Sequence, residues 1–168
     1  DLCAGTGCIG ISIAAICKGA EVYSFEWSNN AYTYLERNIK LHTLRSVKPV
    51  KLDILQYKHN KDAYPPPDII VSNPPYIPMS DIYTLQREVQ YEPVVALDGG
   101  NDGLDFYRAI SERWIPALKC GGIVAVECGI NQAQDIADMF RKSGCCNIDI
   151  IKDYSGIERI VKGEKTIC

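Results

Sequence analysis

The sequence lacks a long apolar run and an N-terminal targeting pattern. Its 168 residues contain no uninterrupted apolar stretch of about 18 residues, the length that a transmembrane helix needs. The first residues do not show the basic, apolar and small-residue order of a signal peptide. We therefore expect a cytoplasmic protein without membrane contact.

A net positive charge is also absent. The chain has 18 Lys and Arg residues against 21 Asp and Glu residues, which gives a formal net charge of -3. Binding to a phosphate backbone usually depends on a broad positive field, and this balance does not supply one. Direct contact with nucleic acid is therefore not expected.

The sequence is poor in metal-ligand patterns. Its two histidines, His42 and His59, are far apart, and its eight cysteines include no C-x-x-C pair. We assign no metal site and expect the cysteines to be reduced, mostly buried thiols. With 46% hydrophobic and 23% charged residues, the composition is that of one globular domain over residues 1–168, which we expect to be a monomer.

Predicted strands alternate with predicted helices along the chain. Helices are expected over about residues 8–18, 28–44, 103–118 and 132–142, with Pro116 bending or shortening the end of the third. Strands are expected over about 21–25, 49–53, 68–72, 123–128, 147–152 and 157–162. Residues 77–101 form a long connection with one helical turn expected near 84–89. The alternation predicts an α/β fold with a mostly parallel sheet and helices on both faces. Because the last two strands are joined by a short link, the last strand should be antiparallel to its neighbour.

A glycine-containing loop begins the chain. Gly5 and Gly7 lie between a strand end and a helix start, where missing side chains let backbone N–H groups approach a ligand. Glu26 stands 19 residues after Gly7 at the end of the second strand, where an acidic side chain accepts hydrogen bonds from ribose hydroxyls. Together these features favour an adenosine-containing cofactor. A tight strand-to-helix turn without a ligand is the alternative.

The end of the third strand offers two more candidate residues. Asp53 could accept a hydrogen bond from an adenine amino group, and Ile54 could pack on the ring. A solvated Asp at a strand end fits the same sequence.

The segment Asn73-Pro74-Pro75-Tyr76 has a constrained backbone. Asn73 and Pro74 each precede a proline, which excludes the helical region and keeps both residues extended. The Asn73 side-chain oxygen and the Pro74 carbonyl can then accept both hydrogens of a planar NH2 group, while the Tyr76 ring stacks on its face. A rigid proline turn without such a ligand is the alternative.

Several motifs together resemble one known family. DLCAGTG, Glu26, NPPY and the stretch YEPVVALDGGNDGLDFYR are similar to S-adenosylmethionine-dependent amino-methyltransferases, and specifically to release-factor glutamine methyltransferases of the PrmC/HemK type. VECGINQAQ and DYSGIERIVKG extend the resemblance over nearly the whole chain. The resemblance implies a Rossmann-like fold and methyl transfer from S-adenosylmethionine to the side-chain amide nitrogen (N5) of glutamine. The implied target is the Gly-Gly-Gln motif of class I peptide-chain release factors.

The same resemblance implies roles for individual residues. The catalytic residues would be Asn73, Pro74 and Tyr76, and Pro75 would join them in binding the substrate. The cofactor-binding residues would be Asp1, Cys3, Ala4, Gly5, Thr6, Gly7, Glu26, Asp53, Ile54 and Asn73. Neither histidine is needed as a general base. We expect residues 77–101 to wall the glutamine pocket.

The sequence departs from the family pattern at three places. Cys3 replaces a frequent glycine, which should alter only local packing, and Glu26 replaces the commoner Asp but keeps the carboxylate. The family also has an N-terminal helical domain that helps to recognise the release factor. We expect that domain and most of the first strand to lie upstream of Asp1.

Two other functions fit part of the sequence. NPPY also occurs in adenine N6-methyltransferases that act on DNA or RNA, although the acidic balance and the stretch from Tyr91 to Arg108 disfavour them. The second alternative is a non-catalytic module, either a partner-binding or nucleotide-binding domain or an inactive cofactor-binding fragment.

Overall fold

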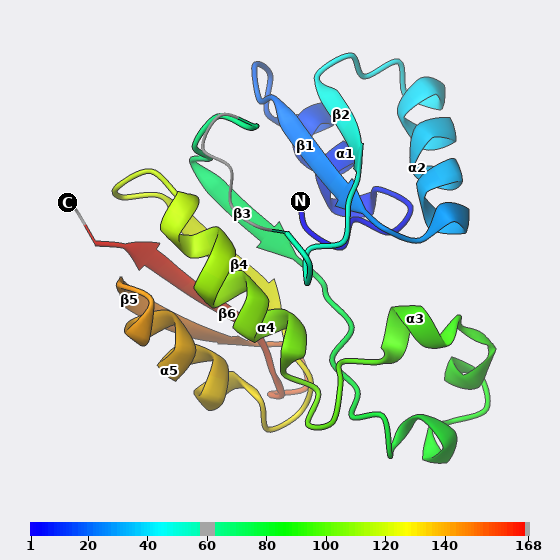
Figure 1. Cartoon of the computed structure of the whole chain (residues 1–168), viewed down its shortest axis with the longest axis vertical. Coiled ribbons are helices and arrows are strands. Elements are labelled where there is room, and N and C mark those ends of the chain that lie inside the picture. The colour runs from blue at the N-terminus through cyan, green and yellow to red at the C-terminus, as the bar shows by residue number, and fades with distance from the viewer. Residues whose placement is uncertain (58–62, 167–168) are drawn as a thin grey trace. The chain divides into compact units, whose positions relative to one another are not determined.

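The computed structural model describes residues 1–57 and 63–166, which divide into two units of helices and strands (Figure 1). The first unit consists of Asp1–Tyr57 and Val71–Asn73. The second consists of the described residues within Lys58–Ile70 and Pro74–Cys168. Each unit has its own buried core.

Parallel pairing organises the first unit. Its elements are α1 (Cys8–Ile16), β1 (Val22–Glu26), α2 (Asn29–Leu41) and β2 (Val47–Lys51). β1 and β2 are parallel, starting with Val22 opposite Val47. Leu2 forms parallel bridges to Phe25 on one side and to Ser72 on the other. The backbone at Leu2 therefore pairs on both of its edges.

The helix boundaries of the first unit follow from a few residues. The Ser28 hydroxyl accepts a hydrogen bond from the Ala31 amide at 3.5 Å, which caps α2. α1 ends at Ile16, two residues before the predicted end, and Gly19 follows in a left-handed conformation (φ 96°). The helices cover the strands through buried apolar side chains, namely Leu2, Ile11, Ala14, Val22, Phe25, Leu35, Val47 and Ile54.

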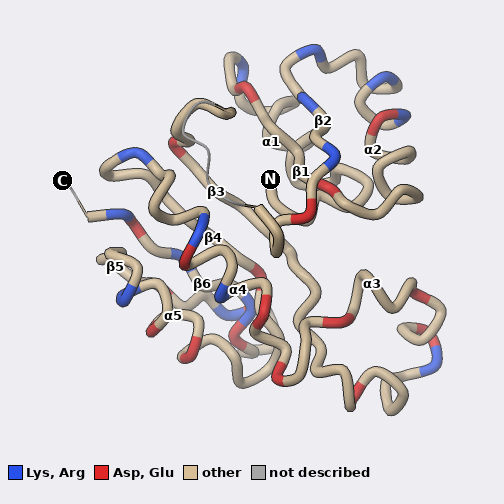
Figure 2. The backbone as a smooth tube through the Cα atoms, viewed as in Figure 1, with Lys and Arg blue, Asp and Glu red and all other residues tan. Residues whose placement is uncertain are grey.

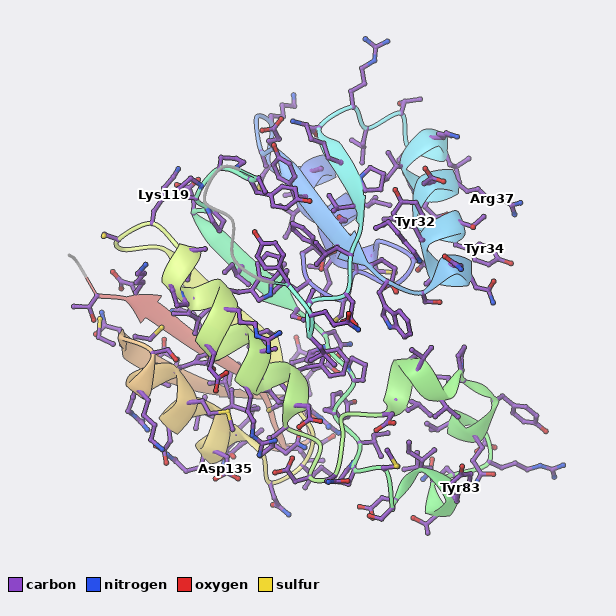
Figure 3. All side chains as sticks on the ribbon, in the orientation of Figure 1. Tyr32, Tyr34, Arg37, Tyr83, Lys119 and Asp135 are labelled. Carbon is purple, nitrogen blue, oxygen red and sulfur yellow. The ribbon has the colours of Figure 1, made fainter. Side chains whose placement is uncertain are left out.

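Charged side chains are spread over both units. Figure 2 shows Lys and Arg interspersed with Asp and Glu along the backbone. Ion pairs such as Lys119 with Asp68 (2.7 Å) join exposed side chains and contribute about 1 kcal/mol at most. On α2, the Arg37 guanidinium lies 5.7 Å from the centroid of the Tyr34 ring (Figure 3). Burial of apolar side chains must therefore supply most of the stability.

A four-stranded sheet organises the second unit. Its strands are β3 (Ile69–Ser72), β4 (Ile123–Glu127), β5 (Cys145–Lys152) and β6 (Glu158–Lys165), in the order β3-β4-β6-β5. The first half of β3 belongs to this unit and the second half to the first unit. β6 is antiparallel to β4 and to β5, with Val161 opposite Val126 and Ile150. The prediction of an α/β fold with an antiparallel last strand is confirmed.

Helix α5 and the segment before β4 cover this sheet. α5 (Ala133–Lys142) packs on β5 and β6. The buried side chains of the unit are mostly aliphatic or aromatic: Leu104, Phe106, Tyr107, Ile110, Trp114, Ile115, Leu118, Val124, Val126, Ile136, Phe140 and Val161. Of the helices in residues 1–57 and 63–166, none is both long and apolar enough to cross a membrane.

The helix predicted over residues 103–118 is only partly α-helical. α4 covers Asp105–Ala109, a π-helical turn follows over Ile110–Trp114, and a 3-10 turn covers Ile115–Ala117. Pro116 explains the change, because it has no N–H and its ring would clash with the carbonyl four residues earlier in a regular α-helix. The predicted shortening at Pro116 therefore occurs, but it begins earlier than expected, because the α-helix already ends at Ala109.

The long connection contains more structure than predicted. It has 3-10 turns at Ile82–Thr84 and Val89–Tyr91 and a short helix, α3, at Val94–Leu97. The single turn predicted near 84–89 is thus replaced by two turns on either side of it. α3 has only four residues, too few to produce a helical period in the sequence.

The cysteines match the prediction only in part. Cys128 and Cys145 are buried free thiols, as expected, whereas Cys8, Cys17 and Cys146 are exposed. Cys120 is disulfide-bonded, so the expectation of a reduced thiol is wrong there.

Two glycines of the second unit allow a matched test of close backbone packing. Gly103 (φ 74°) and Gly156 (φ 82°) both have left-handed backbones, so Ala at either position costs about 1–2 kcal/mol. A Cβ at Gly103 would lie 2.3 Å from the Tyr76 carbonyl oxygen, whereas nothing lies within 4 Å of a Cβ at Gly156. We expect Gly103→Ala to lower the free energy of unfolding by about 2 kcal/mol more than Gly156→Ala. Urea unfolding measures the loss of unfolding free energy in each variant. Equal losses would contradict close packing of Gly103 against the Tyr76 carbonyl.

Candidate active site

The loop after Leu2 extends from the carboxyl ends of paired strands. The Phe25 amide donates to the Asp1 carbonyl at 2.8 Å, and the Ala4 amide donates to the Phe25 carbonyl at 2.9 Å. On the other side, the Leu2 amide donates to the Val71 carbonyl at 2.9 Å. Backbone pairing on both sides therefore fixes the start of the predicted cofactor loop.

The glycines of this loop serve its turn and the packing of α1. Gly5 and Gly7 have φ values of 57° and 94°, which other residues rarely adopt. A Cβ at Gly10 would lie 2.6 Å from the Ser24 hydroxyl oxygen, so α1 can approach β1 this closely only with glycine there. These are the roles that the three glycines of a nucleotide-binding turn play. Asn38 of α2, which the sequence did not single out, donates to the Thr6 carbonyl at 2.9 Å.

Cys3 occupies a strained position in the loop. Its φ of 56° is left-handed, the conformation that glycine adopts without cost. The replacement of glycine therefore carries a conformational cost, and the expectation that it alters only local packing stays a prediction. Burial raises the pKa of the Cys3 thiol well above its usual range, and the nearby Glu26 carboxylate raises it further. Cys3 is consequently a neutral thiol at physiological pH.

Glu26 has a structural role that the sequence did not reveal. The side chain is 7% exposed, although it is charged. One carboxylate oxygen accepts the Gly5 amide at 2.8 Å, and the other accepts the Ser28 amide at 2.7 Å. The carboxylate therefore connects the glycine loop to the start of α2. Each oxygen keeps a second lone pair with which a hydroxyl donor could pair.

The remaining predicted cofactor residues of the first unit differ in exposure. Asp53 is half-buried, and one of its carboxylate oxygens accepts the Leu55 amide at 2.9 Å. Ile54 is buried at 3% exposure. Oδ2 of Asp1 accepts the Gly10 amide at 2.9 Å, and its buried Oδ1 has no partner among the described residues. The sites predicted at these residues stay predictions.

The proline motif joins the two units. Asn73 is the last residue of the first unit and its side chain is exposed, while Pro74 and Pro75 begin a segment of the second unit and are buried. Tyr76 is half-buried. Burial raises the pKa of the Tyr76 hydroxyl, and the Glu127 carboxylate raises it further. Tyr76 is therefore a neutral phenol at physiological pH.

The segment after Tyr76 is paired with the end of the long connection. The Ile77 amide donates to the Leu97 carbonyl, and the Gly99 amide donates to the Ile77 carbonyl, each at 2.9 Å. A Cβ at Gly99 would lie 2.9 Å from the Tyr76 Cα, so a side chain there would displace the motif. Close contact with Tyr76 thus explains Gly99, whereas Gly100 has a left-handed backbone (φ 92°) and lies against the Asp105 side chain.

Ionic and polar contacts hold the turn that follows these glycines. Arg108 pairs with Asp102 and with Asp105, and the Tyr107 hydroxyl donates to the Glu127 carbonyl at 2.8 Å. Arg108 lowers the pKa of the exposed Asp102 carboxyl. The DGLDFYR part of the sequence therefore serves to fix the segment that contacts Tyr76.

The sequence did not identify Gln132 as a site residue. Its side-chain amide contacts the Tyr76 carbonyl, the Gly103 carbonyl and the Gly129 amide. Gln132 lies within the stretch VECGINQAQ, and the resemblance of that stretch to the family was the signal that could have identified it. Over the described residues, no three His, Cys, Asp or Glu side chains gather in a way that could hold a metal ion.

Sequence comparison identifies the family. Residues 1–90 match the family model described as the methyltransferase small domain. The chain belongs to this methyltransferase family. A release factor glutamine methyltransferase from Geobacter sulfurreducens is 40% identical over 164 residues, which are 97% of this methyltransferase chain and 56% of that protein. A ribosomal protein uL3 glutamine methyltransferase from Francisella tularensis is 36% identical over 133 residues, 79% of this chain and 41% of that protein.

Comparison with solved structures supports the fold of the methyltransferase. A methyltransferase structure from Pyrococcus furiosus gives a TM-score of 0.71 at 22% identity, and the match covers 98% of this chain and 72% of that chain. The prediction of a Rossmann-like methyltransferase fold is confirmed. The chain spans 56% of the length of the Geobacter relative.

The bracing role of Glu26 can be tested without a ligand. In Glu26→Gln, one of the two backbone amides would face an NH2 group, so the methyltransferase should lose about 1.5–3 kcal/mol of unfolding free energy. The control Glu21→Gln removes an exposed partner of Lys48 and should cost less than about 1 kcal/mol. Urea unfolding gives both values, and amide hydrogen exchange at Gly5 and Ser28 should rise only in Glu26→Gln. Unchanged exchange at these amides would disprove that the Glu26 carboxylate holds the glycine loop and the start of α2.

Proposed function

We propose that the methyltransferase transfers a methyl group from S-adenosylmethionine to the side-chain amide nitrogen of a glutamine in a protein. The observation that carries this proposal is the Asn73-Pro74-Pro75-Tyr76 segment, in which an exposed amide is followed by buried prolines and a tyrosine with a fixed backbone. The 40% identity to a protein named as a release factor glutamine methyltransferase supports the same chemistry.

The first unit supplies the groups that would bind S-adenosylmethionine. The Glu26 carboxylate would accept hydrogen bonds from the ribose hydroxyls with its remaining lone pairs. Asp53 would accept from the adenine amino group, and Ile54 would pack beside the ring. The loop from Cys3 through Gly7 would bring backbone amides close to the cofactor, and the unpaired Oδ1 of Asp1 would accept from its amino group. When bound, the cofactor supplies the electrophilic sulfonium methyl.

The motif would prepare a poor nucleophile for attack. The nitrogen of a glutamine amide has its lone pair delocalised into the carbonyl. We propose that the Asn73 side-chain oxygen and the Pro74 carbonyl accept its two hydrogens, which orients the nitrogen and stabilises the positive charge that develops on it. The neutral Tyr76 ring would stack on the amide plane. This arrangement needs no histidine as a general base.

We propose the Gly-Gly-Gln motif of class I release factors as the substrate within the cytoplasm. The resemblance of the whole chain to release factor enzymes favours this target over uL3, because the match to the uL3 enzyme covers 79% of the chain rather than 97%. The uL3 protein is kept as a second candidate, since it would present a glutamine to the same acceptors.

Labelled methyl transfer tests the substrate. With radiolabelled S-adenosylmethionine, the chain should label a class I release factor but not the same factor with its Gly-Gly-Gln glutamine changed to Ala. Ribosomal protein uL3, duplex DNA and RNA are compared in parallel. Labelling of uL3 alone would show that uL3, and not a release factor, is the substrate. Labelling of adenine in DNA or RNA would contradict methylation of a glutamine amide. Calorimetric binding of the cofactor with no acceptor labelled would indicate a cofactor-binding fragment.

Replacing Asn73 tests the catalytic role of the motif. Asn73→Ala removes one of the two acceptors for the amide hydrogens, so kcat should fall by about 100-fold or more, as for the loss of other transition-state hydrogen bonds. The affinity for S-adenosylmethionine, measured by calorimetry, should change much less. The control Asn29→Ala removes an exposed amide on α2 and should leave both values unchanged. A normal kcat in Asn73→Ala would rule out the proposed role.

A further inference from the structure

The side chain of Gln132 uses both of its donors and its oxygen acceptor within one small region. Its Nε2 donates to the Tyr76 carbonyl at 2.9 Å and to the Gly103 carbonyl at 3.3 Å, and its Oε1 accepts the Gly129 amide at 3.0 Å. Gln132 is the residue that precedes α5, so its own backbone is anchored to a helix. One amide therefore connects the loops after β3, before α4 and after β4.

Glycines make this connection possible. A Cβ at Gly129 would lie 2.8 Å from the Gln132 Oε1 and 3.0 Å from the Tyr76 Cδ2, and a Cβ at Gly103 would lie 2.6 Å from the Gln132 Nε2. Any side chain at these two positions would enter the space that the amide occupies. The glycines thus leave room for a side chain that reaches the Tyr76 backbone directly.

Gln132 contacts the backbone of Tyr76, the residue at which the chain after the two prolines can rotate. Pro74 and Pro75 have fixed φ angles, and Pro74 also precedes a proline, so most of the backbone freedom of the motif lies at the ψ angle of Pro75 and at Tyr76. Gln132 holds the carbonyl of Tyr76, and pairing of Ile77 with Leu97 holds the next residue. Gln132 and this pairing therefore restrain the backbone from which the Tyr76 ring projects.

We propose that Gln132 is a positioning residue for methyl transfer, acting through Tyr76 without touching the substrate. This proposal rests on the proposed function, because the Tyr76 ring matters for turnover only if it stacks on the acceptor amide. The polarity of the side chain is essential to the role. An apolar side chain of similar length fills the space but leaves two carbonyls and one amide without their partner.

Three variants test the proposal. Gln132→Glu keeps the acceptor for the Gly129 amide but loses both donors at neutral pH, and Gln132→Met keeps the length without any strong hydrogen bond. Gln134→Glu is the charge-matched control, since Gln134 is exposed on α5 and donates only to Asp138 (3.2 Å). We expect kcat to fall about tenfold or more in both Gln132 variants, with unchanged calorimetric affinity for S-adenosylmethionine, and to stay within twofold of the parent in Gln134→Glu.

A pH profile separates positioning from general destabilisation. Lowering the pH protonates the new carboxyl of Gln132→Glu, which regains one donor, so its kcat relative to the parent should rise at acidic pH. Gln132→Met has no such group and should show a constant ratio. If the ratio of variant to parent kcat does not change with pH in either variant, the Gln132 side-chain N–H has no role in turnover.

An NMR measurement tests the contact without turnover. The ring signals of Tyr76, assigned with Tyr76→Phe, should shift in Gln132→Glu and Gln132→Met but not in Gln134→Glu. The Tyr23 and Tyr32 signals in the first unit serve as internal controls. Unmoved Tyr76 signals would disprove the positioning role even if activity falls. If the parent chain methylates no glutamine while these shifts occur, the proposed function fails and the effect of Gln132 on Tyr76 stands.

Discussion

Tyr76 can occupy its place only because two glycines lie against its backbone and a third lies against its ring. Gly99, Gly103 and Gly129 approach the residue so closely that a Cβ at each would lie 2.3–3.0 Å from an atom of Tyr76. Packed backbones have little freedom to shift, since the cost of overlap rises steeply with small displacements. The long connection, the start of α4 and the loop after β4 must therefore keep their positions together if the motif is to keep its own.

In the first unit, a buried carboxylate keeps the glycine loop in its position. Its glycine loop cannot be held by apolar packing, because Gly5 has no side chain and adopts a left-handed backbone. The Glu26 carboxylate supplies the missing contact by accepting the amides of Gly5 and Ser28. A buried carboxylate is costly unless it is hydrogen-bonded, and these two amides offset that cost. The group that shapes the loop is thus the same group that we propose for the ribose hydroxyls.

Short-range features of the site could be predicted from the sequence, and long-range contacts could not. The turn at Gly5 and Gly7 depends on these residues and their neighbours, so its pattern is visible in the sequence, and the extended backbone at Asn73 is a prediction of the same kind. Gln132 contacts a residue 56 positions away, and no spacing rule predicts such a partner. The π-helical turn before Pro116 was missed for another reason: apolar residues kept a helical period although the hydrogen bonding changed. Family resemblance marked the long glycine-rich stretch without explaining it, and only the distances to Tyr76 show why those positions are glycine.

The proposed recognition of an amide hydrogen pair would depend more on the rigidity of the motif than on an ionisable group. The two acceptors proposed for the substrate are a side-chain oxygen and a backbone carbonyl, and neither changes charge between neutral and mildly basic pH. Their effect on the nitrogen depends on where they point, because a hydrogen bond weakens steeply with angle. Any freedom left in the motif would have to be removed when the substrate binds, at a cost in binding free energy. Two prolines, three close glycine contacts and the Gln132 amide restrict that freedom beforehand, so that the proposed acceptors would already be in position when a substrate binds.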